Sequence, residues 1–428
     1  MAATEPQVRM QPYRRFSLAE RDRRWKAIRE LMARDHLDAL VAPPNLGNST
    51  DWQADARYIS HCGGGLDASI GVVLPLEGAV TVLATSAQER WGPKIQDWVT
   101  DVREVNRRYG KGMADRLLEI GLQKGRIGVS GLGFGTRTPE GTIFHGTYMA
   151  LREALPDAEF ISASDLLQEV RQIKSQEEIG VLQRSVDLIE RGLEAQANWA
   201  QPGVPDYVVW AETMHAMYVR GSEHAVHFNW ISGNNPGRTL TRPTERPLEK
   251  GDLLIKEIES SVIGYRAQQL RPLAVHECDP MVVELAKLHA EMYDEILAFL
   301  KPGVTIGQVV EKTRQLGAQV APKSGPLAGA RARMTLHGRG LGDDHPLVLD
   351  SGSAGADALY EGTSRAWEAV FPENGVYICK PGIATADRRY HFEWGDTVRT
   401  TAKGAVRMGK APHGIVISEP RQVSWPQD

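Results

Sequence analysis

The sequence predicts a two-domain fold, with an α/β domain over residues 1–170 followed by an α+β domain over residues 171–428. The chain has 428 residues, which is enough to bury two separate hydrophobic cores. Up to about residue 165, short apolar runs alternate with helical patterns, as expected of an α/β unit. Across residues 164–184 the pattern changes to a short helix, a polar joint and a long amphipathic helix, so we place the boundary there.

The elements of the first domain follow from a capping residue and a series of apolar runs. A helix is expected over residues 17–35. Ser17 can cap it, and Glu20 stands three positions later, as in a capping box. A Glu-Gly turn between two apolar runs indicates a β-hairpin. The runs predict strands at 39–41, 68–75, 79–84, 126–129 and 158–161, with helices around 142–155 and 165–170.

The second domain combines long amphipathic helices with apolar strands. Gln176 opens the first of these helices, directly after the polar joint at 171–175. The helices are expected at 176–199, 205–220, 279–300 and 306–321, and the strands near 226–232, 252–258, 262–270, 375–380 and 396–401.

Charge and cysteine content exclude several classes of protein. Lys plus Arg is 50 and Asp plus Glu is 54, a net charge of −4, so no nucleic-acid partner is expected. The three cysteines, Cys62, Cys278 and Cys379, form no CxxC pair, so neither a disulfide framework nor a zinc knuckle is expected. The polar N-terminus lacks a signal-peptide core, and no apolar run is long enough to span a membrane. We therefore expect a cytoplasmic protein without a membrane partner.

Several short motifs follow one another in a characteristic order. The sequence reads RQIKSQEEI over 171–179, SGNN from Ser232, LEKGD over 248–252, GY at 264–265, HGRGL from His337 and KPG from Lys380. In this order and spacing the chain resembles the pita-bread superfamily of creatinase, prolidase, aminopeptidase P and methionine aminopeptidase. The resemblance implies a creatinase-type N-terminal domain, a pita-bread catalytic domain and a homodimer.

The chain departs from the superfamily where the peptidases bind two metal ions. The five ligand positions, Asp, Asp, His, Glu and Glu, correspond here to Glu257, Gln268, His337, Lys380 and the neighbourhood of Gly395, which Glu393 and Asp396 flank. The acid/base histidine of creatinase corresponds to Leu240. Because an amide is neutral and an ammonium repels cations, we predict no metal pair and no cofactor. The alternative is one metal ion on Glu257, His337 and either Glu393 or Asp396.

The polar residues at these positions lead to a functional hypothesis. Glu257 would attack the substrate or activate water, His337 would carry the proton, and Lys380 and Gln268 would stabilise negative charge. The resemblance to creatinase and ectoine hydrolase then implies a metal-independent hydrolase of a non-peptide C–N bond in a small, polar, anionic molecule. The alternatives are a lyase, an inactive binding module with a structural Glu257–Lys380 ion pair, and, least favoured, an Xaa-Pro metallopeptidase.

Further residues are candidates for binding the substrate. Arginines bind carboxylates through paired hydrogen bonds, so clustered arginines suit an anionic substrate. His227 and Asn229 share one face of a predicted strand, and Trp52 is a candidate for covering the site of a neighbouring subunit. The full set is His227, Asn229, Arg238, Arg266, Arg271, Arg339, Glu393 and Trp52.

Overall fold

The N-terminal domain is a mixed sheet with helices packed against it. The computed structural model describes residues 15–45, 53–63, 69–85, 96–133, 138, 140–224, 229–236, 241–350 and 367–426. A six-stranded sheet has the order β4-β3-β2-β1-β5-β6, in which β1–β2 and β2–β3 are antiparallel and the other pairs parallel. Its strands are β1 (Ala39–Ala42), β2 (Ile70–Pro75), β3 (Thr81–Ala84), β4 (Asp101–Glu104), β5 (Arg126–Val129) and β6 (Glu159–Ser162). The helices are α1 (Leu18–Arg34), α2 (Ala54–Ser60), α4 (Tyr109–Glu119), α5 (His145–Ala154) and α6 (Ser164–Gln172).

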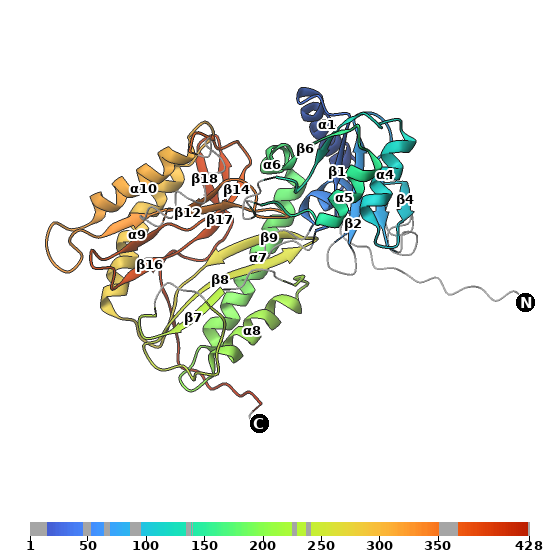
Figure 1. Cartoon of the computed structure of the whole chain (residues 1–428). Coiled ribbons are helices and arrows are strands. Elements are labelled where there is room, and N and C mark those ends of the chain that lie inside the picture. The colour runs from blue at the N-terminus through green and yellow to red at the C-terminus, as the bar shows by residue number, and fades with distance from the viewer. Residues whose placement is uncertain are drawn as a thin grey trace, which may run out of the picture.

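The C-terminal domain is built from helices around curved sheets, which are antiparallel except for the parallel pair β10–β19 (Figure 1). One sheet has the order β19-β10-β8-β7 with β9 on β8, a second has the order β13-β12-β14-β17-β18, and β11-β15-β16 form a third. The helices are α7 (Gln176–Trp199), α8 (Asp206–Tyr218), α9 (Pro280–Phe299) and α10 (Ile306–Val320). The strands are β7 (Asn229–Gly233), β8 (Leu253–Val262), β9 (Tyr265–Leu270), β10 (Leu273–Val275), β11 (Arg331–Arg333), β12 (Thr335–Gly338), β13 (Leu347–Leu349), β14 (Val376–Cys379), β15 (Gly382–Ala384), β16 (His391–Glu393), β17 (Asp396–Thr401), β18 (Gly404–Arg407) and β19 (Val416–Ser418).

The two large sheets of this domain meet where β9 passes β17. The Gln268 backbone N–H donates to Thr397 Oγ1 at 3.0 Å, and that hydroxyl donates back to the Gln268 carbonyl at 2.7 Å. Leu270 and Gly395 form an isolated antiparallel bridge beside this point. β8, β9, β14 and the turn before β17 therefore come together at one place, where the candidate site lies.

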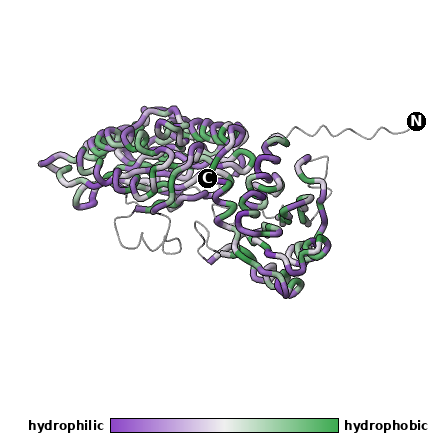
Figure 2. The backbone as a smooth tube through the Cα atoms, turned by 90° about the horizontal axis from the view of Figure 1, so that it is seen from above, coloured by the Kyte–Doolittle hydropathy of each residue, from purple (hydrophilic) through white to green (hydrophobic). Residues whose placement is uncertain are grey.

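A buried ion-pair network ties the two domains together. Arg171 Nη1 lies 2.6 Å from Asp55 Oδ1 of the first domain, and its Nη2 lies 2.6 Å from Asp344 Oδ1 of the second. Lys174 Nζ adds a contact of 2.7 Å to Asp344 Oδ2. Burial opposes ionisation of Asp344, but Arg171 and Lys174 outweigh it and hold its pKa below the usual value. The RQIK motif thus joins the domains, which lie side by side when seen from above (Figure 2).

The predicted fold class is confirmed, and most of the predicted elements are present. Ser17 caps α1 as expected, but its backbone N–H donates to Glu177 instead of Glu20, so the expected capping box is replaced by a contact with α7. α7 starts with a complete capping box between Ser175 and Glu178. Helices α2 and α4 and strand β4 of the first domain were not predicted, and neither were the short strands β10, β11, β12, β13, β15, β16, β18 and β19 of the second. No helix within the described ranges has the length and apolarity needed to cross a membrane.

Candidate active site

Glu257 is the central side chain of the candidate site. Side chains alternate between the two faces of a strand, so β8 presents Glu257 on one face and Lys256 on the other. Asn229 lies directly opposite Glu257 on β7, and its Nδ2 donates to Glu257 Oε2 at 3.0 Å. Glu257 Oε1 accepts from Lys380 Nζ in an ion pair whose side chains are 11% and 4% exposed. The contact between Glu257 and Lys380 that the charges suggested is therefore present.

Lys380 is held in place by its backbone and by a neighbouring glycine. It follows β14, and its backbone N–H donates to the Thr335 carbonyl of β12 at 2.8 Å. A Cβ atom at Gly395 would overlap Cγ of Lys380, so the path of the lysine side chain requires a glycine there. Gly395 stands where the last metal-binding glutamate of the superfamily was expected. The lysine at position 380 and the glycine at position 395 are therefore linked, because the absence of a side chain at Gly395 leaves room for the side chain of Lys380.

Glu393 on β16 is a second carboxylate close to this ion pair. Its side chain is 14% exposed, and Arg333 Nη2 lies 3.4 Å from Oε2. Burial raises the pKa of Glu393, the charge of Glu257 adds to the rise, and Arg333 and Lys380 oppose it. Glu393, Arg333 and His391 line a cavity of about 20 Å³, which has room for about one water molecule. Burial, followed by Arg333, lowers the pKa of His391 to about 4.

Gln268 and His337 occupy different surroundings. Gln268 on β9 is fully buried, and neither atom of its side-chain amide has a hydrogen-bond partner among the described residues. Buried amides are nearly always paired, so this side chain is suited to a water molecule or a bound ligand. His337 on β12 is buried too, with Nδ1 3.5 Å from Asp343 Oδ1. Asp343 in turn accepts from Arg339 at 2.8 Å, which places His337 beside a cluster of buried charges.

The three candidate substrate-binding arginines that the structure describes, Arg266, Arg271 and Arg339, are buried in ion pairs within the chain. Arg339 pairs with Asp343 and Glu259, and Arg266 Nη1 lies 3.8 Å from Glu259. Arg271 Nη2 lies 3.0 Å from Asp396. Their charges are thus already balanced by acids of this chain, and a role in substrate binding stays a prediction. His227, Arg238 and Trp52 lie outside the described residues.

Sequence reasoning missed Arg333. It reaches Glu393 because β11 pairs with β15 and β15 with β16, three strands of three residues each. Such short strands carry no periodic signal, and only the pairing brings the two residues together. The sequence around Arg333 therefore gives no indication that its partner is Glu393.

The two-domain architecture and a polar site between antiparallel sheets define the class as the pita-bread hydrolases with a creatinase-type N-terminal domain. A family model described as "Metallopeptidase family M24" matches residues 181–404, and one described as "Creatinase/Prolidase N-terminal domain" matches residues 24–173. The chain belongs to metallopeptidase family M24, a family of hydrolases.

Individual relatives include peptidases and a creatinase. The chain is 26% identical to the creatinase of Bacillus sp. (strain B-0618) over 70% of this chain and 71% of that protein. It is 21% identical to the Xaa-Pro dipeptidase of Pyrococcus furiosus over 65% of this chain and 74% of that protein. Its fold matches the X-Pro aminopeptidase of Thermotoga maritima with a TM-score of 0.72 and 18% identity, covering 92% of this chain and 99% of that one.

These comparisons correct the predicted function. A metal-independent hydrolase of a non-peptide C–N bond is the wrong leading interpretation, because the family model is that of a metallopeptidase and Xaa-Pro peptidases recur among the relatives and solved structures. The least favoured alternative, an Xaa-Pro peptidase, fits better. The predicted function gave more weight to Gln268 and Lys380 than to the similarity of the whole chain to the peptidases of the superfamily.

The side chains present do not fit the metal pair that the family implies. Glu257 is already paired with the Lys380 ammonium, and Gln268 supplies no charge. The Asp396 carboxylate is held by Arg271 and Arg407 at 3.0 Å each. Within the described ranges, no group of three or more His, Cys, Asp or Glu residues is arranged to hold a metal ion. The reaction proposed in the next subsection therefore assigns no step to a metal ion.

Proposed function

We propose that the chain is a peptidase that hydrolyses the amide bond of a small peptide, with Xaa-Pro dipeptides as the substrates to test first. The single structural observation that supports this is the pair of carboxylates beside Lys380. Glu257 is balanced by an ammonium, whereas burial raises the pKa of Glu393. A carboxylate paired with an ammonium and a buried carboxyl group of raised pKa can serve as base and acid in one reaction.

Each residue has a stated role in this proposal. Glu257 accepts a proton from water, whose oxygen attacks the carbonyl carbon of the peptide. Lys380 lies beside Glu257 and stabilises the negative charge that develops on the carbonyl oxygen. Glu393 then donates its proton to the amide nitrogen as the C–N bond breaks, giving a carboxylic acid and an amine. Gln268 and Asn229 are positioned to hold the peptide or the water through their amide groups.

The test is a panel of dipeptides, with the products followed by mass spectrometry. Ala-Pro, Leu-Pro and Ala-Leu are incubated with the purified chain, with creatine as a non-peptide comparison. Each incubation is run as prepared, with a chelator, and with added Mn²⁺, Co²⁺ or Zn²⁺. We expect free amino acids from at least one Xaa-Pro dipeptide. Release of urea from creatine, with every dipeptide intact in every arm, would contradict the proposal.

Variants of the two carboxylates test the roles. Glu257→Gln should reduce turnover by roughly 100-fold or more, because the amide packs alike but cannot accept the proton. Glu277→Gln is the matched control, since Glu277 is 57% exposed and pairs with Lys250 at the surface. Full activity of a folded Glu257→Gln protein would remove Glu257 from the proposed mechanism.

We also propose that the chain forms a homodimer and works in the cytoplasm. The dimer is supported by the resemblance to dimeric members of the superfamily and by the prevalence of two-fold assemblies. The cytoplasmic location is supported by the three cysteines, all of which are free. Light scattering at micromolar concentration tests the dimer, and a mass near 47.2 kDa would contradict it.

A further inference from the structure

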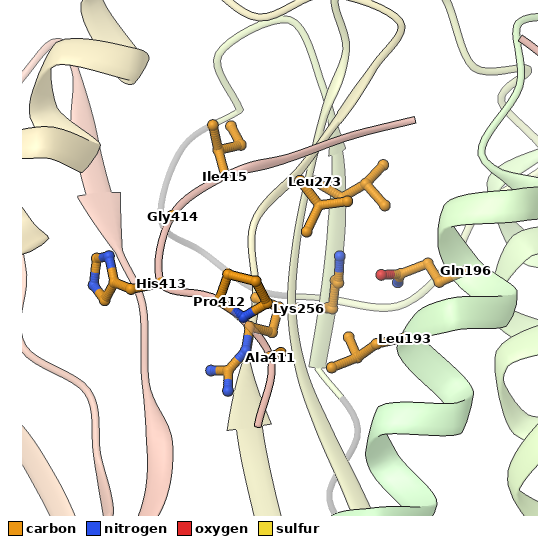
Figure 3. A pocket seen from close by; sticks show the side chains of 11 residues that line it. Leu193, Gln196, Lys256, Leu273, Ala411, Pro412, His413, Gly414 and Ile415 are labelled. Carbon is orange, nitrogen blue, oxygen red and sulfur yellow. The ribbon is translucent and has the colours of Figure 1, made fainter. Parts of the chain in front are cut away.

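A second cavity lies on the opposite face of β8 from Glu257. Its volume is about 200 Å³, and it lies between α7, β8 and the segment 411–416 that precedes β19 (Figure 3). Apolar cavities of about 150 Å³ bind molecules as large as benzene, so this volume is sufficient for a small organic ligand. Nothing in the proposed peptidase mechanism uses this space.

Lys256 is the unusual side chain of this cavity. It lines the cavity from β8, is fully buried, and its Nζ has no hydrogen-bond partner among the described residues. Burial and then the charge of Arg271 lower its pKa well below the usual value for a lysine. An amine placed in such surroundings without a partner costs free energy, so a bound ligand would offset a real penalty.

Two more donors in the cavity wall have no partner. Gln196 of α7 is fully buried, neither atom of its amide is hydrogen-bonded among the described residues, and its side chain extends towards Lys256 (Figure 3). Arg271 directs two other nitrogens to the Leu270 and Gly395 carbonyls and to Asp396, but its Nε has no partner there. Among the described residues that line the cavity there is no aspartate or glutamate.

We propose that this cavity binds a small carboxylate with a short aliphatic chain. The carboxylate oxygens would accept hydrogen bonds from the unpartnered Lys256 Nζ, the Gln196 amide and Nε of Arg271. The aliphatic part would pack against Leu193 and Leu273, which line the apolar side. A carboxylate supplies acceptors for these donors and the negative charge that Lys256 lacks, whereas the charge of Arg271 is already balanced by Asp396.

The segment 411–416 provides a route by which a ligand can enter. It runs as a loop between β18 and β19, and Pro412 in it is exposed to solvent while also lining the cavity. One wall of the cavity is therefore a single layer of chain. The cavity therefore reaches the surface at Pro412, while His413 anchors the segment through a hydrogen bond of 2.8 Å to His289.

Isothermal titration calorimetry of the full chain with isobutyrate tests the proposal. Isobutyrate should bind about tenfold more tightly than acetate because it adds two buried methyl groups, and isobutanol should not compete. Burial lowers the pKa of Lys256, and a carboxylate beside it would raise that pKa again, so binding should be accompanied by proton uptake. The other charged groups facing Lys256 are Arg271, with Asp396 behind it, and His413, whose pKa burial lowers to about 3.

Two variants of the cavity and one surface control decide whether the ligand binds beside Lys256. Lys256→Met removes the buried amine and should abolish binding while the protein folds normally, and Gln196→Leu should weaken it at least fivefold, as about 1 kcal/mol per hydrogen bond implies. Lys250→Met is the matched control, because Lys250 is 61% exposed and pairs with Glu277 just before the same strand. Isobutyrate binding that persists in Lys256→Met, or no binding to the wild-type chain at tens of millimolar, would overturn the proposal. The dipeptide panel is a separate measurement, so the two proposals fail separately.

Discussion

Removing one partner of the Glu257–Lys380 ion pair should destabilise the fold more than removing both. The two side chains are 11% and 4% exposed, so water cannot solvate a charge left alone there. Lys380→Met would remove the ammonium that balances the charge of Glu257, while the neutral amide of Asn229 would remain at 3.0 Å. Breaking such a buried pair costs about 3–5 kcal/mol, whereas replacing both partners by neutral groups is often close to neutral. We therefore expect the double variant Glu257→Gln/Lys380→Met to be more stable than Lys380→Met alone.

The measurement is a double-mutant cycle by urea unfolding at pH 7.5, followed by tryptophan fluorescence. The coupling energy should be about 2–3 kcal/mol. Lys250 and Glu277 provide the control cycle, since their contact of 2.7 Å is similar in length but the side chains are 61% and 57% exposed. That surface pair should couple by less than about 1 kcal/mol.

The result that would refute this reasoning is additivity. If each single variant loses less than about 0.5 kcal/mol and the double variant loses their sum, the ion pair does not stabilise the fold. Activity measured on the same preparations separates structure from chemistry. A Glu257→Gln protein that stays folded but loses turnover supports a catalytic carboxylate, and one that loses stability but keeps turnover in its folded fraction supports a structural ion pair.

Three further predictions concern buried groups nearby. Lys256→Met should raise stability at pH 7, and its advantage should shrink as pH rises towards 10.5, because a lowered lysine pKa makes the wild type more stable at higher pH; urea unfolding from pH 7 to 10 checks this. Glu393→Gln should raise stability at pH 7 and lose that advantage as pH falls through the raised pKa of Glu393 to 4.5, since a raised carboxyl pKa makes the wild type less stable as pH rises; an unchanged difference from pH 4 to 7 would contradict it. Gly395→Ala should cost about 1–3 kcal/mol by overlapping Lys380, which thermal unfolding would show.

The elements that the sequence predicted well are those with local signals. α7 covers Gln176–Trp199, as predicted from its amphipathic pattern and the polar joint before it, and Ser17 caps α1. The three-residue strands β11, β15 and β16 have no such signal, and β11 joins this sheet only by pairing with β15 about fifty residues further along the chain. For that reason the approach of Arg333 to Glu393 could not be predicted.

The candidate site was only partly accessible from sequence for a similar reason. Opposite charges at two aligned positions were sufficient to predict contact between Glu257 and Lys380. The sequence does not show which side chains are buried or how they are solvated, so the raised pKa of Glu393 was not predicted. Lys256 was also missed, although a lysine within the run LLIKEIE is a detectable anomaly in a strand buried on both faces.

The changes at the superfamily's metal positions form a connected set. Lys380 supplies the charge that balances Glu257, and Gly395 leaves the space that the lysine side chain needs. Asp396 is held by Arg271, which follows β9, and by Arg407 at the end of β18. Restoring a glutamate at position 380 alone would place two carboxylates together without the ammonium and without the last ligand. Each of these residues is therefore compatible with the fold because the others accompany it, so the effect of changing one of them depends on the rest.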